Sequence, residues 1–247
     1  WGQHGPLAHA AGHDLNYVAL SGILNHGGHR DSAPAIPPTV VGDIGGGAMF
    51  MALGLVSGIL RARETGQGQV IDGAITDGCA VMSMLIQGLR AQRLWVDRRQ
   101  SNALDGGAHW YDCYQCADGE WISVGALEPQ FYQLLLQKCG LTGQGFEQAQ
   151  FDFANWPALK EKFAAVFRQR TRAEWCELLE GTDVCFAPVL NFAEAQQHPH
   201  NRARNAYIEL EGVTQPAPAP RFSATPGEVR SPPAAIGGET NALLESV

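Results

Sequence analysis

The chain has 247 residues, 45% of them hydrophobic, and a formal net charge of −8. This length provides enough buried area for one large domain or two smaller ones. The acidic balance, together with the lack of a basic cluster or stripe, argues against nucleic acid as a partner.

The chain opens with a Gly/Pro-containing loop at residues 1–12, and a short helix is predicted from there through Leu24. His13 lies at the start of that helix. A lone histidine in a loop is more often a hydrogen-bonded surface or core residue than a base, so both interpretations stay open. Because the chain begins at Trp1 rather than Met, we expect a processed, trimmed or partial protein.

The stretch GDIGGGAMFMALGLVSGIL (42–60) places Asp43 ahead of three glycines and an apolar run with helical spacing. Asp is a favoured N-cap, because its side chain accepts from the unpaired first-turn amides, so we expect the helix to begin there. Gly54 and Gly58 suit close packing on a neighbour, and Gly66 offers a C-terminal stop. The residues expected to face the core are Met49, Phe50, Leu53, Val56, Ile59 and Leu60.

A carboxylate beside bare backbone amides is a suitable place for chemistry, but it is also an ordinary helix cap. From the residues alone, the plain cap is the better interpretation of Asp43. The uncharged run at 44–60 is too short and too rich in glycine for a membrane span, and no signal peptide is visible. We therefore expect no membrane as a partner.

The next predicted elements are a strand at 68–74, an apolar helix at 76–93 and a polar lid or linker at 95–110. Two strands, 111–116 and 121–124, then flank the turn ADGE and indicate a hairpin. Glu128 is expected to cap a helix that carries Pro129 in its first turn. Further along are helices at 156–169, 172–180 and 192–197 and a strand at 184–189, with Thr171 and Glu174 as a capping box before the second helix.

The six cysteines include one close pair, Cys113 and Cys116. The pair lies in a predicted strand, where residues three apart point to opposite faces, and no second pair follows. We expect no metal site, but buried thiols of a reducing compartment and a cytoplasmic location. No nucleophile elbow, P-loop, zincin or dinucleotide fingerprint is present, so composition and spacing alone lead only to a soluble globular α/β protein.

Six motifs in ordered succession resemble the α-methylacyl-CoA racemases of the family III CoA-transferase superfamily. They are GHDLNY (12–17), GDIGGG (42–47), GQGQVIDGA (66–74), LDGGA (104–108), YDCYQCADGEWISVGALEPQFY (111–132) and AEWCELLEGTDVCFAPVLNFAEAQQHPHNRAR (173–204). The resemblance covers nearly the whole chain, but the opening strand–helix units of the family pattern, which supply much of its adenine and phosphate binding, are absent.

The resemblance implies an α/β fold, with a partial Rossmann-like large domain, a small α+β domain and an interlocked dimer. Residues 1–110 would form the C-terminal part of the large CoA-binding domain and residues 111–215 the small domain. Residues 216–247 would be a Pro-rich segment that returns to the large domain. In the family, the active site lies between the large domain of one subunit and the small domain of the other.

The implied activity is that of an isomerase that interconverts (2R)- and (2S)-2-methylacyl-CoA by 1,1-proton transfer through an enolate. His13 matches the group that serves one face, Asp43 the group that serves the other, and Glu128 a carboxylate that pairs with the histidine. The CoA-binding surface would include Gly12, His13, Asp14, Leu15, Asn16 and Tyr17. No cofactor is required, because coenzyme A is part of the substrate; a eukaryotic source would imply peroxisomes or mitochondria.

These roles agree with the chemistry, because inversion through a planar enolate needs an acid and a base on opposite faces. Positioned proton transfer contributes about 10²–10⁴ in rate, and preorganised donors to the enolate oxygen add a further ~10²–10³. We expect those donors to be helix N-terminal amides at Asp43, Ile44 and Gly45.

Two alternatives remain. A CoA-transferase of the same superfamily would use Asp43 as a nucleophile, whereas His13 would have no role as a base. A catalytically silent fragment would oligomerise around an incomplete CoA pocket. His109 and Trp110 are expected at a pocket lid where relatives often carry Pro and an aromatic residue, which affects the acyl-chain preference.

Overall fold

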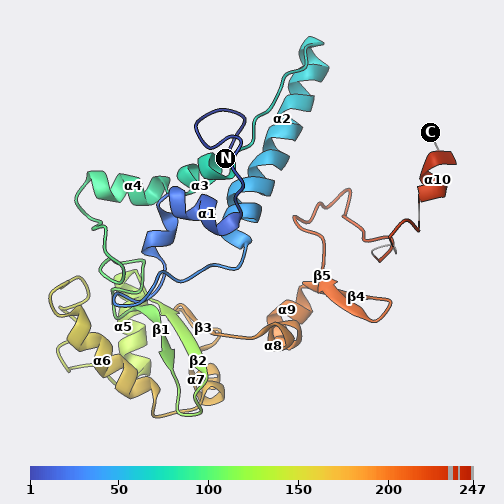
Figure 1. The fold of residues 1–247 in the computed structure, drawn as a ribbon. Coiled ribbons are helices and arrows are strands. Elements are labelled where there is room, and N and C mark those ends of the chain that lie inside the picture. The colour runs from blue at the N-terminus through green and yellow to red at the C-terminus, as the bar shows by residue number, and fades with distance from the viewer. Residues whose placement is uncertain (233–235, 239, 246–247) are drawn as a thin grey trace. The chain divides into compact units, whose positions relative to one another are not determined.

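The computed structural model describes the chain apart from residues 233–235, 239 and 246–247. The described residues form two compact units, Trp1–Pro188 and Val189–Val247 (Figure 1). The predicted limits at residues 110 and 215 divide the chain differently and remain predictions.

The first part of the first unit is helical. Its elements are α1 (Asp14–Leu20), the 3₁₀ helix η1 (Ile23–His26), the π-helix η2 (Val40–Ala48), α2 (Met49–Thr65), α3 (Ile75–Met82) and α4 (Met84–Ala91). The described part of residues 1–110 contains no strand, so the expected strand at 68–74 is wrong. That segment is extended and unpaired, and Ile71 instead packs on Gly54 and Gly58 of α2, as those two glycines predict.

Glycines bring η2 against its neighbours. A Cβ atom on Gly78 of α3 would overlap the backbone of Gly46, and one on Gly42 would overlap the Asp14 carboxylate. The backbones of η2 and α3 therefore touch, which only glycine permits. The GDIGGG motif is thus explained by close packing of η2 against α1 and α3.

The helix does not begin at Asp43, so that prediction is wrong. Thr39 is the N-cap of η2, and Asp43 lies inside the π-helical turn that leads directly into α2. Glycine is a weak α-helix former, and a π-helical turn is frequent where a helix passes a functional site. At the other end the prediction is confirmed, because Gly66 closes α2 in the left-handed conformation with φ of 71°.

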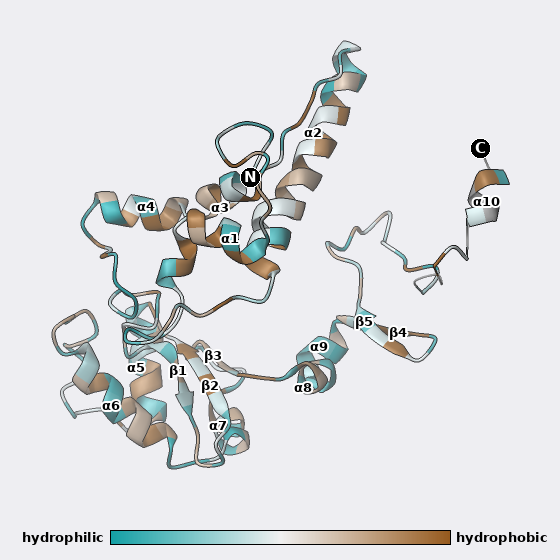
Figure 2. Ribbon diagram, in the orientation of Figure 1, coloured by the Kyte–Doolittle hydropathy of each residue, from teal (hydrophilic) through white to brown (hydrophobic). Residues whose placement is uncertain are grey.

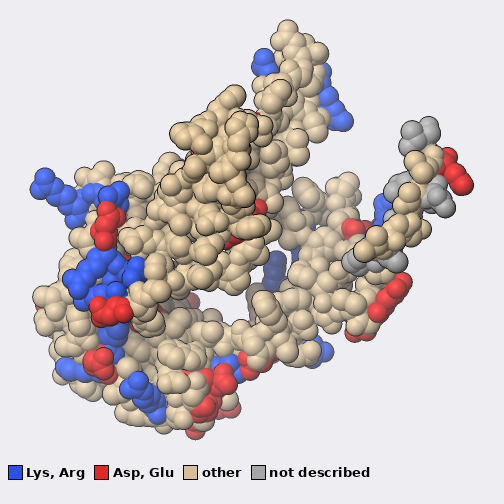
Figure 3. Space-filling view, viewed as in Figure 1, with Lys and Arg blue, Asp and Glu red and all other residues tan. Residues whose placement is uncertain are grey.

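Most of the α2 residues expected to face a core are exposed in the described chain, which contradicts the prediction, whereas Phe50 is half-buried. Leu53 and Val56 are each 66% exposed, and Met49, Ile59 and Leu60 are also exposed. Figure 2 shows hydrophobic residues along the outer turns of α2, and Figure 3 shows its visible charges only at the far end. The periodicity therefore marks a surface that the described chain leaves uncovered.

Together η2 and α2 form one helical segment of 26 residues, Val40–Thr65, which contains an 18-residue stretch with a mean hydropathy of 1.6. By length and composition alone this longer segment could cross a membrane, although charged residues lie on both sides of the uncharged run 44–60. A helix that lies in an apolar protein interface satisfies the same two criteria. The expectation of no membrane remains a prediction.

The predicted helix at 76–93 is two helices, because it is interrupted at Ser83. The backbone N–H of Ser83 bonds to the carbonyl of Cys79, and its hydroxyl donates to the carbonyl of Ala80 at 2.8 Å. Serine competes with the helix in this way through its own side chain.

The second part of this unit is a three-stranded antiparallel sheet with helices. Its elements are β1 (Tyr111–Gln115), β2 (Trp121–Gly125), α5 (Pro129–Lys138), α6 (Trp156–Phe167), α7 (Arg172–Leu179) and β3 (Phe186–Pro188). The order is β1–β2–β3, and the hairpin register pairs Tyr111 with Gly125 and Gln115 with Trp121. The hairpin, the N-cap position of Glu128 ahead of Pro129 and the Thr171–Glu174 capping box are confirmed.

One face of this sheet supports the core and the other is open. Tyr114, Ile122 and Val124 are buried against aromatic residues of α6 and α7, such as Phe163 and Phe167. The opposite face carries Tyr111, Cys113 and Trp121, all exposed, whereas Cys116 is buried. The two cysteines therefore lie on opposite faces, as predicted. Cys113 and Cys185 are exposed, so the expectation of buried thiols is wrong for these two.

The second unit contains α8 (Phe192–Gln197), α9 (Pro199–Ala203), the hairpin β4 (Tyr207–Leu210) and β5 (Val213–Pro216), and α10 (Thr240–Glu245). Helix α8 has the predicted bounds and is capped reciprocally by Asn191 and Glu194. The predicted return segment, 216–247, includes the positions outside the described residues, and its path back to the large domain remains a prediction.

Candidate functional site

The structure joins two of the motifs through a carboxylate. The backbone N–H of Asp43 donates to Oδ1 of Asp14 at 2.7 Å. Asp14 is the first residue of α1 and follows His13, which caps that helix. This hydrogen bond therefore ties the His13 end of α1 to the turn that carries Asp43, across 29 positions of sequence.

A second contact orients the Asp43 carboxylate. The Thr39 hydroxyl donates to Oδ2 of Asp43 at 2.7 Å. Thr39 itself has a positive φ of 44°, a conformation that threonine rarely adopts. No pattern in the sequence predicts this contact, because Thr39 lies before the expected helix start. Both Asp43 and His13 remain exposed in the described chain.

The predicted CoA-binding segment, 12–17, comprises Gly12, the N-cap His13 and the first turn of α1. The Tyr17 hydroxyl donates to the carbonyl of Gly12 at 2.7 Å, and the Asn16 side chain accepts from the His13 backbone N–H. Trp1 packs edge-on against Tyr17 with ring centroids 4.6 Å apart. His13, Leu15 and Asn16 are exposed, so this turn presents side chains to solvent.

The predicted oxyanion donors are not at a helix N-terminus. The Asp43 N–H donates to the Asp14 carboxylate, and the Ile44 N–H donates to the carbonyl of Thr39 at 3.4 Å. Gly45 lies inside η2 with them. The expectation of free amides is therefore wrong for Asp43 and Ile44, because η2 starts at Val40, three residues before Asp43. The role of the three residues toward an enolate remains a prediction.

Glu128 lies at the N-cap of α5, but its side chain makes no capping hydrogen bond. The residue is exposed, and none of its described hydrogen bonds or ion pairs joins His13 or Asp43. Among the described residues the structure thus brings His13 and Asp43 into one helical group and leaves the Glu128 carboxylate facing outward. The plain-cap interpretation of Glu128 does not account for its side chain.

A cavity of about 760 Å³ opens on the free face of the three-stranded sheet. Tyr111 and Trp121 supply the aromatic wall, while Gly125 and Cys185 border the side nearest Glu128. Burial, with Glu128 and Asp183 nearby, raises the pKa of the Cys185 thiol. The volume falls in the range of small-molecule sites, which are concave and mostly apolar.

The loop that leads into β1 is held in place by its own polar groups. Asn102 is 2% exposed and bonds to both the N–H and the carbonyl of Val96. The Asp105 carboxylate accepts from the N–H groups of Asn102 and Gly107. Lys160 then pairs with Asp112 at 2.7 Å and also contacts the carbonyl of Gly106. This part of the predicted lid or linker is a fixed wall of the cavity.

His109 and Trp110 do not lie in a lid, which corrects the prediction. Both are fully buried within the core of the second part. His109 Nε2 lies 2.7 Å from the Tyr132 hydroxyl, which donates to the carbonyl of Phe146. The hydroxyl therefore accepts from Nε2–H, and Nδ1 has no partner among the described residues. These residues fill the core.

The CoA-transferase family III model matches residues 1–240 of the chain. The chain is 44% identical over 227 residues to the alpha-methylacyl-CoA racemase of Mus musculus, covering 92% of this chain and 59% of that protein. It is 41% identical to the alpha-methylacyl-CoA racemase of Homo sapiens, with 99% and 64% coverage. The chain thus spans about 60% of the length of these curated relatives.

A transferase is more distant. The acetyl-CoA:oxalate CoA-transferase of Acetobacter aceti is 28% identical, over 87% of this chain and 56% of its own length. Among solved structures, a CAIB/BAIF family protein from Brucella suis superposes with a TM-score of 0.81 at 21% identity, covering 100% of this chain and 65% of that one. The fold expected from the motifs is confirmed, and the chain belongs to CoA-transferase family III.

Proposed function

We propose that the protein is a racemase that moves the proton on the carbon α to a CoA thioester, interconverting (2R)- and (2S)-2-methylacyl-CoA. The observation that carries the proposal is the hydrogen bond from Asp43 N–H to Asp14. It holds an imidazole-bearing helix end and a carboxylate-bearing turn together, and these are the two groups that inversion requires.

In this proposal His13 and Asp43 serve opposite faces of the enolate, one as base and the other as acid. Thr39 occupies Oδ2 of Asp43, so Oδ1 is the oxygen that exchanges the proton. A fixed carboxylate orientation matters, because proton transfer needs heavy atoms within about 2.6–3.2 Å of each other. No cofactor is needed, since the thioester itself makes the α-proton acidic.

The comparisons favour a racemase over a transferase. Identity to the named racemases is 41–44%, against 28% for the oxalate transferase. A transferase would use Asp43 to form an acyl anhydride and would need no imidazole at His13. Hydrogen exchange at the α-carbon is therefore the activity that separates the two.

We further propose that the working form is a homodimer in which Glu128 of one chain approaches His13 of the other. Two observations support it: the Glu128 side chain is not used as a cap, and α2 exposes a long apolar face. Burying such a face is the usual source of stability in obligate dimers. The cytoplasmic location expected from the free thiols stays part of this proposal.

The activity is tested by incubating enantiopure 2-methylacyl-CoA with the protein in deuterium oxide. Deuterium at the α-carbon with loss of optical purity is expected. Acyl transfer to a carboxylate acceptor without α-exchange would identify a transferase instead, and neither reaction would identify a silent fragment.

The assembly is tested by light scattering on the Leu53→Glu, Val56→Glu double variant, with Arg61→Glu as a charge control outside the apolar face. The double variant should be a monomer at concentrations where the wild type and the control are dimers. A wild-type monomer, or a double variant that remains a dimer, would contradict the proposal.

A further inference from the structure

A network of arginine and glutamine side chains joins two loops at the rim of the cavity on the sheet. The Arg99 guanidinium donates to three backbone carbonyls, at Asn25 (3.3 Å), His29 (3.0 Å) and Ser32 (2.6 Å). In the opposite direction, the Arg30 guanidinium donates to the carbonyl of Gln100 at 2.9 Å. The loop that carries His29 is thereby locked onto the loop that leads into β1.

This network also fixes the side chain of Gln100. The backbone N–H of Arg30 donates to Oε1 of Gln100 at 3.1 Å, which places the Gln100 amide nitrogen on the other side. That nitrogen lies 3.1 Å from Nδ1 of His29. Gln100 is held at a positive φ of 47°, a conformation that persists only where surrounding contacts determine it.

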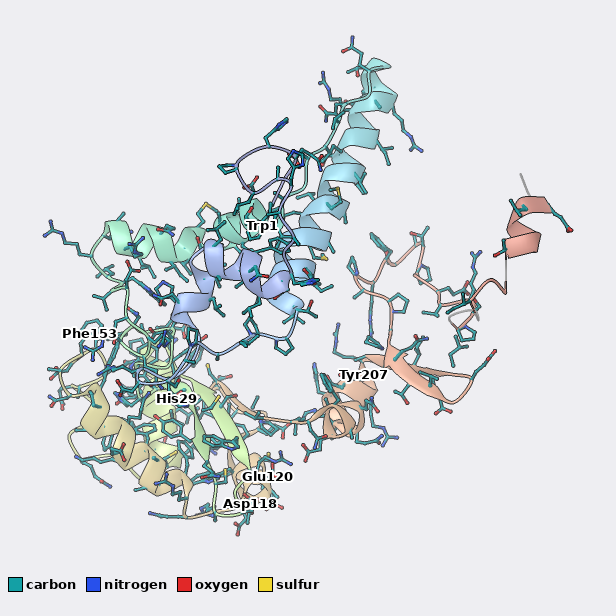
Figure 4. All side chains as sticks on the ribbon, viewed as in Figure 1. Trp1, His29, Asp118, Glu120, Phe153 and Tyr207 are labelled. Atoms are coloured by element: carbon teal, nitrogen blue, oxygen red, sulfur yellow. The ribbon has the colours of Figure 1, made fainter. Side chains whose placement is uncertain are left out.

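The hydrogen-bond directions then follow one from another. Because an amide nitrogen only donates, His29 Nδ1 must be the acceptor, and a neutral imidazole therefore carries its proton on Nε2. His29 and Gln100 both line the cavity, and Figure 4 shows His29 beside the sheet. No described residue accepts from His29 Nε2–H.

The other polar groups of the cavity are mostly committed elsewhere. Asp105 accepts from backbone N–H groups, and Asp112 pairs with Lys160. The hydroxyls of Ser123 and Thr182 donate to the carbonyls of Ala187 and Leu179. Tyr111 and Trp121 also carry polar hydrogens on the wall, but no described contact fixes the direction of either. His29 Nε2–H is thus a donor group of the cavity that a second residue, Gln100, orients.

We propose that His29 is a specificity-determining residue: its Nε2–H, oriented by Gln100, recognises a hydrogen-bond acceptor on the otherwise apolar acyl group of the CoA thioester. This inference rests on the proposed function, because it takes the acyl group of the CoA thioester as the ligand of the cavity. The aromatic wall accommodates the hydrocarbon, and the exposed imidazole at the rim adds a preference for acyl groups with an ether, carbonyl or ring nitrogen that reaches it.

The test uses two isosteric ligands, 2-phenylpropanoyl-CoA and its pyridyl analogues, which differ by replacement of one ring CH with nitrogen. Titration calorimetry on the wild type should show tighter binding of a pyridyl ligand by about three- to tenfold, the value of one net hydrogen bond. His29→Leu should abolish that ratio, and His29→Gln, which retains a donor at the same reach, should restore most of it.

Tyr111→Phe is the contrast variant, and its ratio should stay at the wild-type value. A ratio that persists in His29→Leu, a ratio lost only in Tyr111→Phe, or no binding of either ligand would overturn the proposal. Failure of the proposed function has another signature: the His29-dependent ratio would remain while no deuterium enters the α-carbon.

A readout independent of ligand is the ¹⁵N spectrum of the His29 ring. The Nε2–H tautomer should dominate at neutral pH in the wild type, and Gln100→Leu should reduce its excess. A dominant Nδ1–H tautomer in the wild type would contradict the assigned donor.

Discussion

The two parts of the first unit treat their apolar residues in opposite ways. From Ala108 to Val184, nineteen hydrophobic residues form one buried cluster, dominated by aromatic rings. In the helical part before it, the few fully or nearly buried hydrophobic residues include Val18, Ala74 and Cys79, whereas most of the apolar side chains of α2 are exposed.

This difference separates folding from assembly. The sheet and its helices bury their own apolar face, so their stability comes from contacts within the chain. The helical part also has periodically spaced apolar residues, along α2, but nothing in the described chain covers most of them. Contiguous exposed apolar surface of this kind marks an interaction site. The residues that we assign to catalysis, His13 and Asp43, belong to this uncovered part.

The largest effect is expected from a cavity in the aromatic core. Phe163 is fully buried among Tyr114, Phe146 and Phe167. Phe163→Ala should lower the free energy of unfolding by about 3–5 kcal/mol, because it removes buried area and leaves a void. Urea denaturation followed by tryptophan fluorescence measures it.

The matched change in the other part is Leu53→Ala, at a residue that is 66% exposed. In a dilute monomer it should alter the unfolding free energy by no more than about 0.5 kcal/mol. At protein concentrations where copies associate, Leu53→Ala should lower the unfolding free energy by more than this. Equal losses for Phe163→Ala and Leu53→Ala at every concentration would break the comparison.

The buried imidazole in the same core makes stability depend on pH. Burial, and to a lesser extent Lys160, lowers the pKa of His109 to about 4 from the ordinary 6.5. Above pH 6.5 the imidazole is neutral in both states. As pH falls from 6.5 toward 4, the unfolded chain binds a proton that the folded one does not, so stability falls by about 3 kcal/mol in total.

Since carboxylates also titrate near the lower end, the His109 contribution is the difference between wild type and His109→Phe. That variant should lose the slope between pH 6.5 and pH 4.5 in urea denaturation. A variant with an unchanged slope would show that another group carries it.

A smaller effect is expected at the contact between α1 and η2. Gly42→Ala would place a Cβ against the Asp14 carboxylate and Val18, so it should cost about 1–3 kcal/mol of stability and disturb the Asp43 turn. Gly68→Ala is the control, because open space surrounds that position. Thermal unfolding of the two variants should differ clearly, and a neutral Gly42→Ala would show that η2 can move away from α1.

The smallest effect concerns the cap of α7. The Thr171 hydroxyl accepts from Glu174 N–H, and the Glu174 carboxylate accepts from Thr171 N–H at 2.8 Å. Thr171→Ala should cost about 1 kcal/mol, whereas Thr171→Ser should cost little. Equal chemical-denaturation midpoints for the alanine and serine variants would show that the hydroxyl contributes nothing.

The sequence predicted the second part of the unit well, because its signals are local. The turn ADGE, Pro129 after Glu128 and the Thr171–Glu174 pair each determine an element boundary within a few residues. The helical part was predicted less well. A strand at 68–74 needs a neighbouring strand, and the start of η2 depends on Asp14 and α3, which lie far away in sequence.

The candidate site residues follow from motifs and their roles remain predictions, whereas their contacts were not predicted at all. His13, Asp43 and Glu128 came from motifs, and the structure shows the first two in one helical group. Thr39 and the Asp14 link were missed, since a threonine before a helix and a carboxylate after a histidine have no distinctive spacing. The orientation of His29 by Gln100 joins residues 71 positions apart and leaves no local pattern.

The most direct test of the two-base account is deuterium incorporation from each enantiomer of a 2-methylacyl-CoA, for wild type, His13→Ala and Asp43→Ala. Each variant should lose net racemisation, by about 3–5 kcal/mol in transition-state stabilisation, from the general acid–base factor of 10²–10⁴. His13→Ala should suppress α-exchange more strongly from one enantiomer, and Asp43→Ala more strongly from the other. Equal residual exchange from both enantiomers in the His13 variant would contradict the assignment.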